Sequence, residues 1–189
     1  RSLLKWAIGR LEAKPEAVVL THSHFDHAAN AAWLKREYGM KVVIHSSEAE
    51  NIAAGKTNLP SGTFAVTRFL ISIGRRLPSW FSYEKCTPDM TFSKTVSLDE
   101  FGIDGQLIHT PGHSIGELAV IINNELAICG DSIMGVIPGR VFPIFADDIG
   151  DTIKAWKTLL DTGCSLFIPG HGRPVKREIL EKEYRRKKR

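Results

Sequence analysis

A dense group of metal-binding side chain types lies near the start of the chain. Residues 21–27 read T-H-S-H-F-D-H, which places His22, His24, Asp26 and His27 within six positions, directly after a short apolar run. Neutral imidazole and carboxylate are the ligand types that suit zinc, and also iron or manganese, in an open catalytic site. Alternate side chains of an extended backbone point the same way, so His22 and His24 can converge on one ion. Asp26 and His27, which turn into the next predicted helix, can face another.

Three later segments each place a further candidate ligand after a predicted strand. Residues 106–109 lead into His113, residues 127–129 lead into Asp131, and residues 166–168 lead into His171. Glycines beside these ligands let the backbone turn sharply and approach closely. This repeated layout predicts that the candidates lie along one sheet edge. The expected metal ligands are therefore His22, His24, Asp26, His27, His113, Asp131 and His171.

The ordered combination of H-x-H-x-D-H, G-H-S, G-D-S and G-H-G resembles the metallo-β-lactamase superfamily over nearly the whole chain. The resemblance implies an α/β (α+β) fold, a four-layer αββα sandwich with two metal ions at one edge of its two sheets. It assigns the first ion to His22, His24 and His113, the second to Asp26, His27 and His171, and a bridging role to Asp131. It also implies that about fifty residues, including several strands, normally precede the first helix, so we expect an N-terminally incomplete domain.

Two adjacent cations can lower the pKa of a shared water from about 15.7 toward about 7 and so supply hydroxide at neutral pH. We therefore expect a dinuclear metal-dependent hydrolase, with zinc as the expected metal and iron or manganese as alternatives. In this hypothesis Asp131 holds the pair of ions, and Asp26 orients the attacking water or accepts its proton. The expected partner is a small-molecule substrate with an ester, thioester, lactone or phosphodiester bond.

The resemblance narrows the substrate and leaves an alternative. True β-lactamases of this fold generally carry a cysteine or serine at the position of Asp131, so the glyoxalase II, lactonase and phosphodiesterase branches fit better. A mononuclear-iron oxidoreductase of the persulfide dioxygenase type keeps the H-x-H-x-D-H pattern and remains an alternative. Diiron flavoproteins of this fold use a glutamate where His24 stands, which argues against them. His45 and His109 lie at or within predicted strands, and we expect them outside the metal shell.

The elements that must position these residues follow from hydrophobic periodicity. We predict a helix over residues 2–11, a buried strand over 17–20, a helix over 28–38 that ends at Gly39, and a second strand over 41–44, which together form a βαβ unit. Ser46 or Ser47 can cap a further helix over 46–54. Residues 55–90 interrupt the alternation with an apolar helical stretch, which we interpret either as an insertion that acts as a lid or as an ordinary core helix.

Strands dominate the second half. They are predicted over residues 91–98, 106–109, 117–122 and 125–128, with Asn123 and Asn124 at the turn between the last two. A capped helix over 148–160, a short strand over 166–168 and a terminal helix from Lys176 complete the chain. No internal repeat or linker divides it, so residues 1–189 are expected to form a single domain.

Composition excludes several classes of protein. With 189 residues and 43% hydrophobic side chains, the chain fits a globular domain rather than a disordered or fibrous one. The net charge of +4 owes much to residues 185–189, a run we interpret as a solvated helix end, so nucleic acid is an unlikely partner. Three cysteines without a C-x-x-C pair suggest the reducing cytoplasm. No apolar run approaches the roughly 18 residues that span a bilayer, so we expect no membrane partner. An uncovered sheet edge would favour a homo-oligomer.

Overall fold

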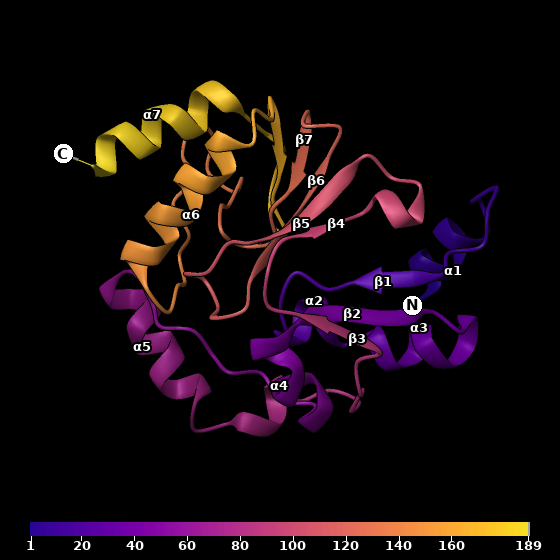
Figure 1. Cartoon of the computed structure of the whole chain (residues 1–189). Helices are drawn as coiled ribbons and strands as arrows, with labels where there is room; N and C mark the ends of the chain where they lie inside the picture. Colours follow the sequence, from indigo (N-terminus) through magenta and orange to yellow (C-terminus); the bar gives the residue numbers. More distant parts are fainter. Residues whose placement is uncertain (189) are drawn as a thin grey trace.

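The computed structural model describes residues 1–188, in which two β-sheets lie between two layers of helices (Figure 1). The first sheet has the parallel order β1-β2-β3, formed by β1 (Ala17–Val19), β2 (Lys41–His45) and β3 (Met90–Phe92). The second has the order β4-β5-β6-β7-β8-β9, formed by β4 (Val96–Ser97), β5 (Gly105–His109), β6 (Leu118–Ile122), β7 (Leu126–Ile128), β8 (Leu166–Ile168) and β9 (Val175–Lys176). All its pairs are antiparallel except β7 with β8.

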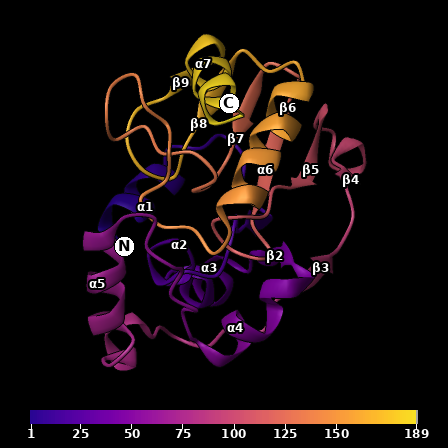
Figure 2. The same cartoon turned by 90° about the vertical axis from the view of Figure 1, so that its left-hand side faces the viewer.

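The helices fall into two layers, with one helix apart from both. α2 (Phe25–Ala28), α3 (Ala31–Tyr38) and α4 (Ala49–Ala54) cover the first sheet, and α1 (Ser2–Ile8) packs on α3. α6 (Ile149–Asp161) and α7 (Arg177–Lys187) cover the second sheet. α5 (Ala65–Gly74) stands at the outer edge of the molecule (Figure 2). Short 3₁₀ turns lie at Ser46–Glu48, Pro78–Phe81 and Asp99–Phe101.

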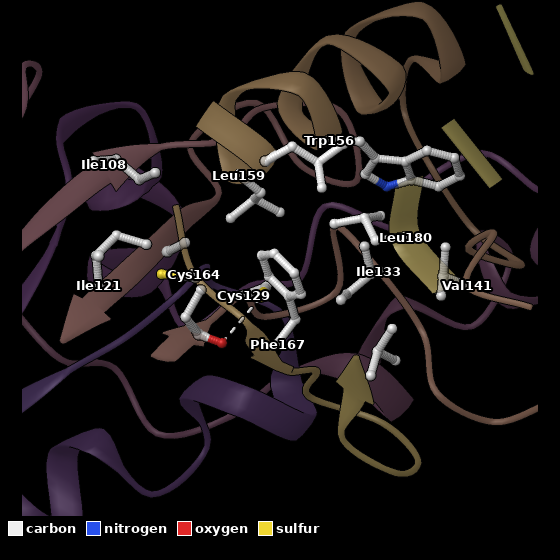
Figure 3. Packing of buried hydrophobic residues seen from close by; sticks show 14 residues of the cluster. Ile108, Ile121, Cys129, Ile133, Val141, Trp156, Leu159, Cys164, Phe167 and Leu180 are labelled. Atoms are coloured by element: carbon white, nitrogen blue, oxygen red, sulfur yellow. Dashed lines mark hydrogen bonds between the residues drawn. The ribbon is translucent and has the colours of Figure 1, made fainter. Parts of the chain in front are cut away.

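Alternation of side chains along the strands produces three apolar layers. Ile108 of β5 points toward α6 and α7, where it joins a cluster that includes Trp156, Leu159 and Phe167 (Figure 3). Leu107, its neighbour, instead packs between the two sheets with Val43 and Leu118. On β2 the neighbours of Val43, Val42 and Ile44, face the other way into a cluster with α2, α3 and α4. The order of layers is therefore helix, sheet, sheet, helix, as expected for an αββα sandwich.

Most predicted elements are confirmed, including the hairpin turn. Asn123 and Asn124 both have a φ of 52°, the left-handed conformation that tight hairpin turns require, and they join β6 to β7. Asp148 caps α6 through a hydrogen bond of 2.8 Å from the backbone N–H of Asp151 to its carboxylate. No helix within residues 1–188 is long and apolar enough to cross a membrane.

Several predicted boundaries were wrong. The strand predicted over residues 91–98 is two strands, because the chain leaves the first sheet after β3 and enters the second as β4. The helix predicted over 28–38 begins earlier, at Phe25, and is broken between Ala28 and Ala31. The turn after β2 is capped by Nδ1 of His45, which accepts from the backbone N–H of Ser47, and not by a serine. The short strand β9 was not predicted.

Candidate metal centre

Three of the candidate ligands follow strands of the second sheet that run in the same direction. β5 and β7 are both antiparallel to β6, and β8 is parallel to β7. Ile128 pairs with Ile168, and Asp131 and His171 each follow three residues later. Since the carboxyl ends of these strands meet at one sheet edge, His113, Asp131 and His171 arrive at the same place.

The other four candidates come from the loop after β1 and from α2. The backbone N–H of Leu118 donates to the carbonyl of Thr21 at 2.9 Å, which ties this loop to the second sheet. His24 is the N-cap residue of α2, and its carbonyl accepts from the backbone N–H of Ala28 at 2.8 Å. The extended loop therefore presents His22 and His24, and the first turn of α2 presents Asp26 and His27.

The seven side chains meet in three overlapping groups whose ligand atoms lie within 4.8 Å of one another: His22 with His24 and His113, His22 with His27 and Asp131, and Asp26 with His27 and His171. Asp131 belongs to the second group and lies between the first and the third. Its Oδ1 is 3.6 Å from Nε2 of His27, and its Oδ2 is 3.6 Å from Nε2 of His113 and 3.4 Å from Nε2 of His171. This arrangement suits two ions with a carboxylate between them.

The hydrogen bonds of His24 and His113 leave one unprotonated nitrogen on each ring, and these two nitrogens point toward each other. Nε2 of His24 lies 2.9 Å from the carbonyl of Asn58, and Nδ1 of His113 lies 2.9 Å from the carbonyl of Phe145. A carbonyl only accepts, so each of these ring nitrogens carries the proton and the other nitrogen of each neutral ring is an acceptor. Those two acceptors, Nδ1 of His24 and Nε2 of His113, are 3.0 Å apart. Two lone pairs repel at that distance, and a cation between them removes the conflict.

Of the six buried side-chain atoms without a hydrogen-bond partner among residues 1–188, three belong to the seven candidate ligands. They are Nε2 of His22, Nε2 of His27 and Oδ1 of Asp131. A buried polar atom without a partner costs about 1–3 kcal/mol, so three in one small group need an explanation. Metal coordination would supply it, and the mixture of imidazole and carboxylate fits zinc, iron or manganese.

Burial and mutual repulsion keep the deep histidines neutral. The pKa of His22 is lowered well below its usual value by burial and by the neighbouring histidines. Burial together with His113 lowers the pKa of His24 to about 4, and burial lowers the pKa of His113. Burial opposes ionisation of Asp131, but His27 and His113 outweigh it and lower the pKa of this carboxyl. Neutral imidazole and ionised carboxylate are the forms that bind metal.

The cluster forms the polar floor of an otherwise apolar cavity of about 390 Å³. Five of the seven candidate ligands line it: His24, Asp26, His113, Asp131 and His171. The remaining lining is mostly apolar and includes Phe25, Leu59, Ile71, Phe81, Ile144 and Phe145. Ile71 belongs to α5 and Phe81 to the turn that follows it, so the segment interpreted as either an insertion or a core helix contributes to the cavity wall. None of the residues that line the cavity is a lysine or arginine.

The sequence analysis missed two buried carboxylates behind the cluster. Glu117 has no exposed surface, lies 3.6 Å from Nδ1 of His22, and accepts hydrogen bonds from the backbone N–H of Asp131 and the hydroxyl of Ser132. Burial raises its pKa well above the usual range. Glu48 accepts from the hydroxyl of Ser23 and the backbone N–H of Gly116. For Glu117, the signal available in the sequence was its position directly before the apolar run of β6.

His45 and His109 lie outside the three groups. Their rings stack with centroids 4.1 Å apart, and Nε2 of His109 lies 2.9 Å from the carbonyl of Ile115. The two residues end β2 and β5, and neither belongs to the three groups of candidate ligands.

Among curated proteins, the chain is 23% identical over 144 residues to a protein of Shewanella pealeana named hydroxyacylglutathione hydrolase, a match that covers 76% of this chain and 43% of the relative. Among solved structures, a metallo-beta-lactamase superfamily protein from the archaeon Sulfolobus tokodaii aligns with a TM-score of 0.67 and 21% identity over 94% of this chain and 69% of the other. TTHA1623 in a di-iron-bound form aligns with a TM-score of 0.67 and 22% identity over 97% and 82%.

The structural similarity shows that the fold is that of metallo-β-lactamases, although the chain spans about half the length of the curated relatives that it matches. The family model described as metallo-beta-lactamase superfamily matches residues 1–171, and this chain therefore belongs to that superfamily.

Proposed function

We propose that the chain is a dinuclear metal-dependent hydrolase that cleaves an ester, thioester or lactone with an apolar acyl group. The observation that carries this proposal is the pair of donor groups joined by Asp131 at the floor of an apolar cavity. His22, His24 and His113 would hold one cation and Asp26, His27 and His171 the other. Zinc is the proposed metal, and iron and manganese suit the same donors. When bound, the cations supply an activated water and polarise the bond that is attacked.

The side chains of the cluster then have distinct tasks. Asp131 holds both donor groups in register, because its two oxygens face different histidines. Asp26 is partly exposed to the cavity, with Oδ2 3.0 Å from Nε2 of His171. We assign to Asp26 the orientation of the attacking water and the transfer of its proton to the leaving group. The bond that forms joins the water oxygen to the acyl carbon, and the bond that breaks joins that carbon to the leaving oxygen or sulfur.

The cavity wall favours a neutral carbonyl substrate over a phosphodiester. A phosphodiester carries a negative charge, and beyond the two proposed cations no arginine or lysine lines this cavity to meet it. Apolar residues such as Leu59, Phe81 and Phe145 instead suit a hydrocarbon or aromatic acyl group. The name of the curated relative, hydroxyacylglutathione hydrolase, agrees with an acyl-transfer reaction to water.

The second donor group argues against the alternative of a mononuclear-iron dioxygenase. A single-metal site of that kind would leave part of the cluster unused, whereas here Nε2 of His27 is buried without a partner and faces Asp131. Metal content separates the two functions, since the hydrolase requires two ions for each chain and no oxygen.

A cytoplasmic location is also proposed, because Cys86, Cys129 and Cys164 are all free thiols.

The test is a substrate panel assayed after removal of metal and after its return. Short and long acyl thioesters, a lactone, an acetyl ester and a phosphodiester are each supplied to the metal-free and the reloaded protein, with metal content measured by elemental analysis. We expect activity only after reloading, two ions per chain, and a preference for longer acyl groups. Activity in metal-free protein, preference for the phosphodiester, or one iron with oxygen consumption would each contradict the proposal.

A further inference from the structure

The outer helix α5 exposes its apolar residues to solvent. None of its ten residues is buried, and Val66, Phe69, Leu70 and Ile73 recur at the spacing of one helix face. Val66 is 70% exposed, Phe69 is 64% exposed, and Trp80 in the turn beyond the helix is 74% exposed. We call these five residues the α5 face. An apolar helix face that meets only water is typical of an interaction surface.

The charged side chains of the segment that carries the α5 face are all positive, and the nearest carboxylate from elsewhere is Asp147, beside Arg75. Residues 51–83 contain no aspartate or glutamate, while Arg68, Arg75 and Arg76 lie on or beside the helix and are exposed. None of these three arginines takes part in an ion pair among residues 1–188. The partner that fits is therefore both apolar and negatively charged. In a two-fold symmetric pair of this chain the same segment would meet itself and bring its positive charges together, which disfavours a second copy as the occupant.

The segment also borders the catalytic cavity. Ile71 points away from the α5 face and lines the cavity together with Phe81. The same short segment therefore offers one apolar surface to solvent and another to the metal cluster. Exposed aliphatic and aromatic side chains on a surface helix, with arginines on and just after the helix and an exposed tryptophan in the next turn, resemble the composition of segments that lie in the interface of a membrane.

We infer that the α5 face binds the surface of an anionic lipid bilayer. The helix lies in the plane of the interface, Phe69, Leu70 and Trp80 enter the boundary between headgroups and acyl chains, and the arginines contact lipid phosphates. The prediction of no membrane partner rested on the lack of a spanning segment, and a helix that lies on a bilayer need not span it. This inference goes beyond the proposed hydrolysis, and vesicle binding requires neither metal nor substrate.

The experiment is co-sedimentation of the chain with vesicles of phosphatidylcholine alone and with vesicles that also contain phosphatidylserine. We expect binding to the anionic vesicles only, weakened by salt. The double variant F69S/W80S should bind at least about tenfold more weakly, because it removes two large apolar side chains from the interface. Each of Arg68→Gln and Arg76→Gln should weaken binding about fivefold.

Matched variants decide between this surface and its rivals. F101S removes a phenylalanine that is 56% exposed on another part of the surface and should bind vesicles like the unaltered chain. R185Q/K188Q neutralises part of the basic C-terminal run and should reduce binding much less than R68Q/R76Q. Loss of binding in R185Q/K188Q alone would overturn the inference. So would absence of vesicle binding together with a dimer in gel filtration that F69S/W80S dissociates. Circular dichroism checks that every variant is folded.

Discussion

Glu117 and His22 form a buried carboxyl–imidazole contact directly behind the candidate metal ligands. Oε1 of Glu117 lies 3.6 Å from Nδ1 of His22, and neither side chain has exposed surface. Because Nδ1 faces Glu117 and Thr21, the ring turns its other nitrogen, the unpartnered Nε2, toward the cluster. Glu117 also accepts from the backbone N–H of Asp131, so one carboxylate contacts both the first candidate ligand and the residue that joins the two groups.

Replacement of Glu117 by glutamine should weaken metal binding about 10–100-fold, the range for groups that orient metal ligands. The variant keeps the size of the side chain but replaces one acceptor oxygen by an N–H donor, which opposes the Nδ1–H form of His22. Competition with a chromogenic chelator measures the affinity directly. E183Q alters another buried glutamate, which is paired with Arg186 on α7, and should leave metal affinity unchanged. Equal affinity in E117Q and the unaltered chain would show that Glu117 serves packing alone.

Gly170 should be intolerant of even a methyl group. A Cβ at this position would lie 2.5 Å from Oδ1 of Asp131 and 2.5 Å from Cε1 of His27. Gly170→Ala should therefore displace these two side chains, lower metal affinity by at least about tenfold, and abolish most hydrolysis. Gly150→Ala is the control, since its Cβ would meet only a side-chain oxygen of Asp148 at 3.1 Å and alanine favours the helix. Full metal loading of G170A would contradict the expectation.

The candidate site was more predictable from sequence than the path of the chain. The candidate ligands lie in segments that come after short apolar strands, and Asp131 and His171 each stand three residues after the paired residues Ile128 and Ile168. The local sequence pattern is therefore enough to predict where these ligands lie in the fold. Glu117 was missed because a glutamate at the start of a strand looks solvated in sequence, and only the packing of β6 against the loop after β1 shows that it is buried.

The errors in the fold have a common physical cause. Alternation of side chains has the same period in both sheets, so residues 91–98 gave no sign that the chain passes from one sheet to the other between Phe92 and Val96. The exposure of α5 was equally hidden, since a stripe at helical spacing predicts a buried face whether or not the fold provides something to cover it. Tertiary packing decides both features.

Asp89 should contribute modestly to stability in a way that depends on pH. Its carboxylate accepts from Nζ of Lys35 at 2.7 Å and from the backbone N–H of Val42 at 2.9 Å, and these contacts lower its pKa. Because the pKa is lower in the folded than in the unfolded state, the stabilisation is present above the usual value of 3.8 and is lost as pH falls below it. Asp89→Asn should cost about 0.5–1 kcal/mol at pH 7 and little below pH about 3. Urea unfolding at both pH values measures the difference, and an equal cost at both would exclude a charge effect.

Metal binding should stabilise the fold, because the cluster without cations holds unpartnered atoms on His22, His27 and Asp131 and two opposed acceptors on His24 and His113. A ligand at 100 times its Kd adds about 2.7 kcal/mol to the free energy of unfolding, which for a chain of this size corresponds to a rise in Tm of about 5–10 °C.

His171→Ala removes the most exposed histidine of the group formed by Asp26, His27 and His171, and it leaves the group of His22, His24 and His113 intact. It should therefore retain one ion and part of the rise, whereas His22→Ala removes a donor shared by two groups and should lose most of it. Calorimetry with zinc, manganese and iron, combined with elemental analysis, separates these cases, and a Tm that none of the three metals moves would be incompatible with a metal centre here.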